Sequence, residues 1–135
     1  MSIFDKLIVW TLPLVPKPIV GYFSKKYIAG STLKDAVRVI KELNINGMMA
    51  TMDLLGEESK EEEKARLSVE EYIKILTTIH DEKIDSNVSV KPTQMGLLID
   101  KELCYQHIRQ IVETAKEFNN FVRIDMEDRH CTTDT

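Results

Sequence analysis

The 135-residue chain contains little cysteine and no long hydrophobic run. Its two cysteines, Cys104 and Cys131, are too few for a disulfide scaffold and fit a reducing compartment better than secretion. No run reaches the roughly 18 apolar residues of a membrane-spanning helix, so none is expected. Lys and Arg total 18 against 22 Asp and Glu, which gives a net charge of −4. Nucleic-acid-binding surfaces usually need a basic excess, so this charge argues against such a partner.

Motifs that bind nucleotides or metals are also missing. The sequence has no phosphate-binding P-loop, no G-x-G-x-x-G dinucleotide fingerprint and no metalloprotease motif. His130 and Cys131 are adjacent but lack any known metal-ligand spacing, so no metal site is predicted. With 43% hydrophobic and 30% charged residues, the composition is that of one soluble globular domain.

The N-terminal segment, residues 1–30, contains the most apolar stretch of the chain. Residues 7–15 include Trp10 and Pro13, and Lys6 is the only basic residue that precedes them. A signal peptide needs a basic start and an uninterrupted apolar core, so secretion is not expected. We expect residues 1–30 to form a short helix or turn that packs on the main body, with a weak membrane-surface contact as the alternative.

The chain after residue 30 contains three segments with the apolar spacing of helices. The first begins at Ser31 or Thr32, either of which can cap it, and an asparagine–glycine pair ends it. The second begins at a capping box formed by Ser68 and Glu71. Asp100 can cap the third helix, which two asparagines end.

Short apolar or alternating runs predict strands at 48–55, 87–91 and 121–126. Strands that alternate with helices predict a parallel sheet with right-handed helical crossovers. A small open α/β sheet could use three such strands. The alternative is a partial (β/α)₈ TIM barrel, in which residues 31–135 form the first three strand–helix units after the N-terminal helical segment.

Charged side chains lie at or just after the end of each predicted strand. Asp53 lies near the end of the first strand and Glu57 follows it, Lys91 ends the second, and Asp125 lies near the end of the third, with Glu127 after it. In α/β folds, ligands bind at the carboxyl ends of the strands. The sequence therefore predicts a pocket for a polar substrate at this edge of the sheet.

Strand alternation places several of these charges on one face. Lys91 shares a face of its strand with Asn87 and Ser89, and Asp125 shares a face with Arg123. Burying these charges without partners would cost several kcal/mol. They must pair with one another, with a ligand or with other parts of the protein, and a closed salt-bridge cluster without a ligand is the simplest alternative. Lys91 could also be a Schiff-base lysine.

Other chemically capable side chains are expected to have packing roles. His80 and His107 lie on predicted helices, far apart in sequence, and Cys104 lies beside an apolar stripe. The remaining candidates for the core are the three methionines Met48, Met49 and Met52.

Three blocks at the strand ends resemble the proline dehydrogenase family. They are residues 50–57 (ATMDLLGE), residues 87–97 (NVSVKPTQMGL) and residues 122–128 (VRIDMED). The resemblance spans roughly residues 22–135 and is greatest to the short, monofunctional bacterial enzymes. Pro92, where the family usually has leucine, and the Arg129-His130-Cys131 sequence depart from the family pattern.

This resemblance implies a distorted (β/α)₈ barrel that holds FAD non-covalently and oxidises L-proline to Δ1-pyrroline-5-carboxylate. It implies that Lys91 neighbours the proline carboxylate and that Asp125 is the active-site aspartate near substrate and flavin. Met126 would line the flavin site, and Glu57 would close the pocket by pairing with a later arginine. Asp53 is a further substrate-pocket candidate.

The resemblance also implies partners and a location. A membrane quinone would reoxidise the flavin, and the protein would be cytoplasmic or peripheral at the inner face of the membrane. Because the family's later flavin-binding strands and arginine-bearing C-terminal helix are not in these residues, we expect an N-terminal part of one barrel domain that is inactive alone.

Two other functions stay open from the sequence. One is a Schiff-base aldolase that uses Lys91, and the other is a non-catalytic interaction piece that needs a partner. The oligomeric state is not predicted.

Overall fold

The computed structural model describes residues 28–56, 58–127, 129 and 131–134. The chain divides into two units, Met1–Ala36 and Val37–Thr135, and the second carries every described strand. The helix or turn expected for residues 1–30 lies outside the described part of the chain, except for residues 28–30.

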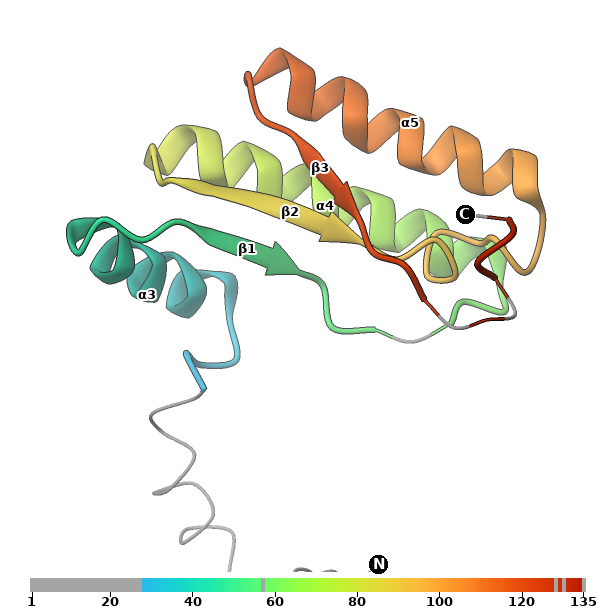
Figure 1. Ribbon diagram of the computed structural model, residues 1–135, viewed down its shortest axis with the longest axis horizontal. Coiled ribbons are helices and arrows are strands. Elements are labelled where there is room, and N and C mark those ends of the chain that lie inside the picture. The colour runs from blue at the N-terminus through green and yellow to red at the C-terminus, as the bar shows by residue number, and fades with distance from the viewer. Residues whose placement is uncertain (1–27, 57, 128, 130, 135) are drawn as a thin grey trace, which may run out of the picture. The chain divides into compact units, whose positions relative to one another are not determined.

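The fold alternates helices and strands, as the sequence predicts (Figure 1). The elements, in chain order, are α3 (Leu33–Ile45), β1 (Ala50–Asp53), α4 (Glu62–Glu82), β2 (Ser86–Val90), α5 (Lys101–Glu117) and β3 (Val122–Ile124). The strands form one parallel sheet in the order β1-β2-β3. Helix α4 packs on β2 and on α5, and α5 also contacts β3. The predicted α/β class with parallel strands is confirmed.

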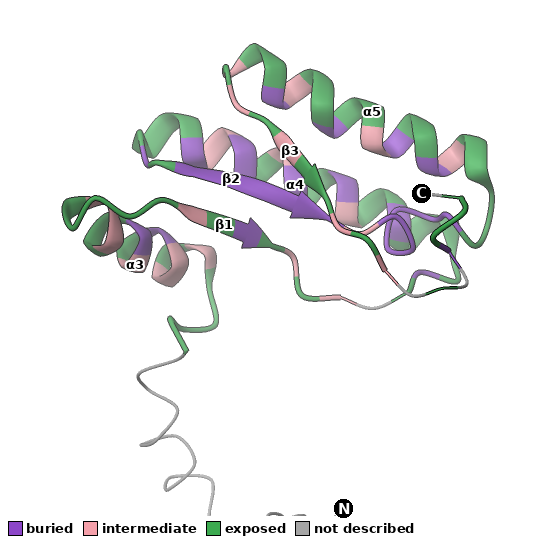
Figure 2. Ribbon diagram, in the orientation of Figure 1, coloured by how far each residue is buried: buried purple, intermediate pink, exposed green. Residues whose placement is uncertain are grey.

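Strand β2 lies at the centre of the sheet and is buried along its whole length (Figure 2). Its valines, Val88 and Val90, have no exposed surface. The core that they join contains side chains from α4 and α5; the fully or almost fully buried ones are Ala65, Val69, Tyr72, Leu76, Cys104, Ile111 and Ala115. Parallel sheets covered by crossover helices bury their central strands in this way.

The outer strands are shorter than the sequence predicts. Strand β1 begins at Ala50, which pairs with Ser86 at the start of β2, so the residues before it have no strand beside them. Met48 and Met49 are therefore exposed, and the prediction that they fill the core is wrong, whereas Met52 is buried as predicted.

The predicted start of the second helix is also wrong. Helix α4 begins at Glu62, so Ser68 lies inside it and its hydroxyl donates to the carbonyl of Lys64 at 3.1 Å instead of capping. Ion pairs one turn apart stabilise the added residues, because Arg66 Nη2 lies 2.7 Å from Glu63 Oε1. The charged residues from Glu62 to Lys64 thus form the exposed first turn of the helix.

The other helix ends follow the sequence. Asp100 Oδ1 accepts a hydrogen bond from the backbone N–H of Leu103 at 2.8 Å and caps α5. Thr32 Oγ1 accepts from the N–H of Asp35 at 3.2 Å, while Asp35 Oδ2 accepts from the N–H of Thr32 at 3.2 Å, which caps α3. Beyond α5, Asn119 adopts the left-handed conformation with φ 51°.

His80, His107 and Cys104 have the packing roles predicted for them. The His80 ring stacks on Phe118 with ring centroids 4.5 Å apart, and buried His107 places Nδ1 2.9 Å from the carbonyl oxygen of Met95. Burial, with a smaller contribution from the charge of Glu127, raises the pKa of the Cys104 thiol to about 11. Among the described helices, none is both long and apolar enough to cross a membrane.

The cap of α5 provides a test of the fold. Asp100→Ala should lower the free energy of unfolding by about 1 kcal/mol, because the Leu103 N–H loses its acceptor. Asp81→Ala, at an exposed position on α4, should change it by less than about 0.5 kcal/mol. Urea unfolding followed by circular dichroism measures both values, and equal values for the two variants would contradict the cap.

Candidate active site

The register of the three strands determines which polar side chains lie beside one another on the sheet. Asp53 pairs with Ser89 on β2, and Ser89 pairs with Arg123 on β3, so these three residues form one row across the sheet. Side chains two residues further along a strand point to the same face. Lys91 and Asp125 therefore follow on that face, at the carboxyl end of β2 and β3, which we call the carboxyl edge.

Lys91 and Asp125 lie together at this edge. The backbone N–H of Asp125 donates to the carbonyl of Val90 at 2.9 Å, which places Asp125 beside Lys91. The prediction that both side chains stand at the same edge of the sheet is confirmed.

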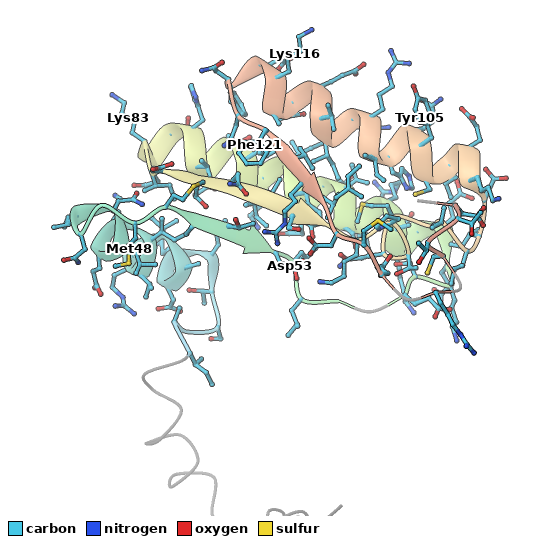
Figure 3. The ribbon with its side chains drawn as sticks, in the orientation of Figure 1. Met48, Asp53, Lys83, Tyr105, Lys116 and Phe121 are labelled. Atoms are coloured by element: carbon cyan, nitrogen blue, oxygen red, sulfur yellow. The ribbon has the colours of Figure 1, made fainter. Side chains whose placement is uncertain are left out.

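The direct partner of Lys91 is Asp53. The Lys91 ammonium donates to Asp53 Oδ2, and the two side chains remain 29% and 39% exposed. Figure 3 labels Asp53 at the end of β1. Strand parity places Lys91 and Asp125 on one face and leaves the partner of the lysine open, and the structure shows that the lysine reaches back to Asp53 at the end of β1.

Asp125 is held by Arg123 and Ser89. Arg123 Nε lies 2.9 Å from Asp125 Oδ1 and 3.2 Å from Ser89 Oγ. The hydrogen bond from Ser89, together with the charges of Arg123 and Lys91, lowers the pKa of the Asp125 carboxyl. Asp125 is therefore a carboxylate at neutral pH, and its side chain is 30% exposed.

The charges form two linked pairs, with buried Ser89 between them. Lys91 and Asp53 make one pair, and Arg123 and Asp125 make the other. The salt-bridge cluster that the sequence offers as an alternative to a ligand site is thus present, but it is open to solvent. A small polar ligand can reach both signs of charge at the carboxyl edge.

Tyr72 on α4 contacts the site, although its place among the apolar residues of that helix predicts only burial. Its ring is fully buried, and its hydroxyl lies 2.8 Å from the carbonyl oxygen of Ser89 and 3.1 Å from Asp53 Oδ1. The backbone N–H of Leu54 donates to the same hydroxyl at 3.2 Å. Burial raises the pKa of Tyr72, and the charges of Asp53 and Asp125 act in the same direction. A tyrosine within an apolar stripe carries no sequence signal for this contact.

Glu127 has a local structural role. Its carboxylate accepts hydrogen bonds from the Thr93 N–H at 2.8 Å and from the Thr93 hydroxyl at 2.6 Å. It therefore joins the end of β3 to the turn that follows β2. The sequence places Glu127 on the polar face, but these two hydrogen bonds direct its carboxylate oxygens toward Thr93 in the segment after β2.

Gln94 in the same turn is a second residue that the sequence does not single out. Its Nε2 donates to the carbonyl of Leu54 at 3.4 Å, and a Cβ at Gly56 would come within 2.3 Å of that nitrogen. Its Oε1 and the Oδ1 of Asn87 are buried without a hydrogen-bond partner among the described residues. The glycine thus makes room for the glutamine beside the segment that follows β1.

Met126 and Glu57 are the two other site residues that the sequence predicts. Met126 follows Asp125 directly and is 62% exposed at the carboxyl edge. Glu57 lies outside the described residues.

The lowered pKa of Asp125 predicts a pH-dependent contribution to stability. Since the folded state depresses this pKa below 3.8, the stabilisation is fully present above pH 3.8 and is lost as the pH falls through the folded value. Asp125→Asn should therefore lower the free energy of unfolding at pH 7, and its difference from the wild type should shrink below pH 3.8. Urea unfolding across this pH range measures the difference, and a constant difference would contradict the assignment.

Comparisons with known proteins identify the family. The proline dehydrogenase family model matches residues 36–133. Proline dehydrogenase 1 of Bacillus subtilis subsp. natto is 39% identical over 105 residues, which are 78% of this chain and 35% of the relative. Proline dehydrogenase 2 of Bacillus subtilis (strain 168) is 40% identical over 103 residues, which are 76% of this chain and 34% of the relative.

A solved structure shares the fold. It is the crystal structure of proline utilization A (PutA) from Bdellovibrio bacteriovorus inactivated by N-propargylglycine, with a TM-score of 0.71, 23% identity, and coverage of 79% of this chain and 14% of that chain. The chain spans about a third of the length of the curated relatives it matches. The family match covers most of the described residues, and the chain belongs to the proline dehydrogenase family.

Proposed function

We propose that these residues are the first three strand–helix units of a (β/α)₈ barrel that oxidises L-proline to Δ1-pyrroline-5-carboxylate with FAD. The observation that carries the proposal is the accessible pair of opposite charges, Lys91 and Asp125, on adjacent parallel strands at the carboxyl edge. Membership of the proline dehydrogenase family supplies the substrate class. No feature of the described residues favours the aldolase alternative.

The charges at the carboxyl edge match the chemistry of an amino-acid zwitterion. The Lys91 ammonium can donate to the proline carboxylate, and charge-assisted hydrogen bonds of this kind are the stronger ones. Asp125, kept ionised by Ser89 and Arg123, can accept from the secondary ammonium of proline. Asp53 already neutralises Lys91, so it holds the ammonium at the edge until a substrate carboxylate shares it.

The carboxyl edge also fits one side of a flavin ring. Met126 directly follows Asp125 in the chain and has an exposed apolar side chain, and a thioether packs well against an aromatic ring system. When bound, FAD supplies the hydride acceptor for proline oxidation. Met126 would contact the flavin, while Lys91 and Asp125 would orient proline and Asp53 would position Lys91.

The remaining assignments rest on family membership. Glu57 would close the pocket by pairing with an arginine from a later part of the barrel. A membrane quinone would accept the electrons, and the protein would act in the cytoplasm or peripherally at the inner face of the membrane.

Activity is expected to need the rest of the barrel. Among the described strands, β1 and β3 each pair on one side only, whereas a closed barrel of this class needs eight strands. We therefore expect the 135-residue chain alone to bind FAD poorly and to lack proline oxidation. Flavin absorbance of the purified chain and proline-dependent dye reduction test this, and a yellow, active protein would contradict it.

A chimera tests the substrate role of Lys91. Residues 36–133 replace the matched segment of Bacillus subtilis proline dehydrogenase 1, which supplies the remaining strands. Lys91→Ala in this chimera should lower kcat/KM for proline about 10- to 100-fold with flavin content near normal, because a charge-assisted hydrogen bond is worth about 1.5–3 kcal/mol. Steady-state kinetics and the ratio of flavin to protein absorbance measure the two effects.

Lys74→Ala is the matched control. Lys74 lies on the exposed face of α4 and pairs only with Glu71 among the ion pairs of the described residues, so kcat/KM should not change. Loss of FAD from the Lys91 variant with unchanged proline affinity in the remaining holoenzyme would contradict the role given to Lys91. Covalent trapping of a carbonyl substrate on Lys91 by borohydride would favour the aldolase instead.

A further inference from the structure

The hydroxyl of Tyr72 joins three parts of the sheet at the point where β1 ends. Tyr72 belongs to α4, and its ring is fully buried in the core. Its hydroxyl nevertheless lies against the carbonyl of Ser89 on β2, the carboxylate of Asp53 on β1 and the N–H of Leu54 just beyond β1. Strand pairing between β1 and β2 stops at Asp53. The backbone N–H of the next residue, Leu54, donates its hydrogen bond to the Tyr72 hydroxyl instead of to a strand.

The two oxygens of Asp53 have different partners. Oδ1 lies 3.1 Å from the Tyr72 hydroxyl, while Oδ2 accepts from the Lys91 ammonium. The single hydroxyl proton is shared between Asp53 Oδ1 and the Ser89 carbonyl, which lies 2.8 Å away. Because each oxygen is engaged from a different side, the rotation of the carboxylate is fixed, and with it the position from which Lys91 is held.

A buried hydroxyl group destabilises the fold unless it makes hydrogen bonds. A tyrosine hydroxyl without hydrogen bonds in the core would cost free energy, and phenylalanine would fill the same space on the apolar stripe of α4. The hydroxyl here satisfies the backbone N–H of Leu54 and also reaches a charged group of the candidate site. Its placement thus links the helix side of the sheet to the polar face.

We propose that Tyr72 is a positioning residue that orients the Asp53 carboxylate and, through it, the Lys91 ammonium at the carboxyl edge. The link from Lys91 to the proline carboxylate rests on the proposed function. The link from Tyr72 through Asp53 to Lys91 rests on the contacts alone and can be tested without substrate or flavin.

Chemical labelling of Lys91 tests this role in the 135-residue chain. An amine-acylating reagent is applied to the folded protein, and mass spectrometry measures the labelling rate at Lys91. Tyr72→Phe and Asp53→Asn should each raise that rate several-fold, because each frees the ammonium from a fixed acceptor. Tyr105→Phe removes the same atom from an exposed tyrosine on α5 and should leave the rate unchanged.

Two outcomes of the labelling would overturn the role. One is a Tyr72→Phe rate equal to the wild type while Asp53→Asn is faster, since Asp53 would then hold Lys91 without help from the hydroxyl. The other is an equal rise in the Tyr105→Phe control, since the rise would then not depend on the contact between the Tyr72 hydroxyl and Asp53.

A second measurement leaves Tyr72 in place, in case Tyr72→Phe does not fold. Tyrosine labelled with ¹³C at Cζ gives a resonance for each ring, and Asp53→Asn should shift that of Tyr72 and leave that of Tyr105 unmoved. An unmoved Tyr72 resonance would overturn the contact with Asp53.

Kinetics of the chimera connect this role to proline. Tyr72→Phe should raise KM for proline severalfold with a smaller change in kcat, because it disturbs a binding group; a fall in kcat at constant KM would overturn that connection. A wild-type chimera that does not oxidise proline would contradict the proposed function, whereas the labelling result alone decides the positioning role.

Discussion

The parallel register of three short strands is the constraint on which the candidate site depends. Asp53, Ser89 and Arg123 lie in one row because the register pairs Asp53 with Ser89 and Ser89 with Arg123, and the next residues on that face are Lys91 and Asp125. Helices α4 and α5 lie together on the other face, so the valines of β2 enter the core and the polar side chains stand on the face away from these two helices. A slip of one residue in β2 would bury Lys91 against the helices and expose Val90.

The polar face is stable because it is internally neutral. Two cations and two carboxylates pair on either side of Ser89, and the Tyr72 hydroxyl and the Glu127 carboxylate satisfy backbone groups where the strands end. The charges therefore do not need a ligand to be compensated. They remain partly open to solvent, which is the property that a site for a small zwitterion requires.

The sequence predicts the parts of this arrangement that follow from periodicity. Alternation along β2 and β3 is enough to place Lys91 and Asp125 on one face, because side chains in a strand repeat every two residues. Alternation does not predict that Asp53 is the ion-pair partner of Lys91, because this contact depends on how far the flexible lysine side chain reaches across the strands. Tyr72 was missed because a helical stripe predicts burial of the ring and gives no information on its hydroxyl. Ser68 and Glu71 match a capping box, but the ion pairs of the preceding turn extend the helix past it.

The most direct measurement of the central claim is the coupling free energy between Lys91 and Asp53. A double-mutant cycle with Lys91→Met and Asp53→Asn, followed by urea unfolding at low ionic strength, isolates it. Because the pair is partly exposed, we expect a favourable coupling of about 0.5–1 kcal/mol, with none between Lys91 and Asp81. A coupling of zero between Lys91 and Asp53 would contradict the claim that β1 holds the lysine at the carboxyl edge.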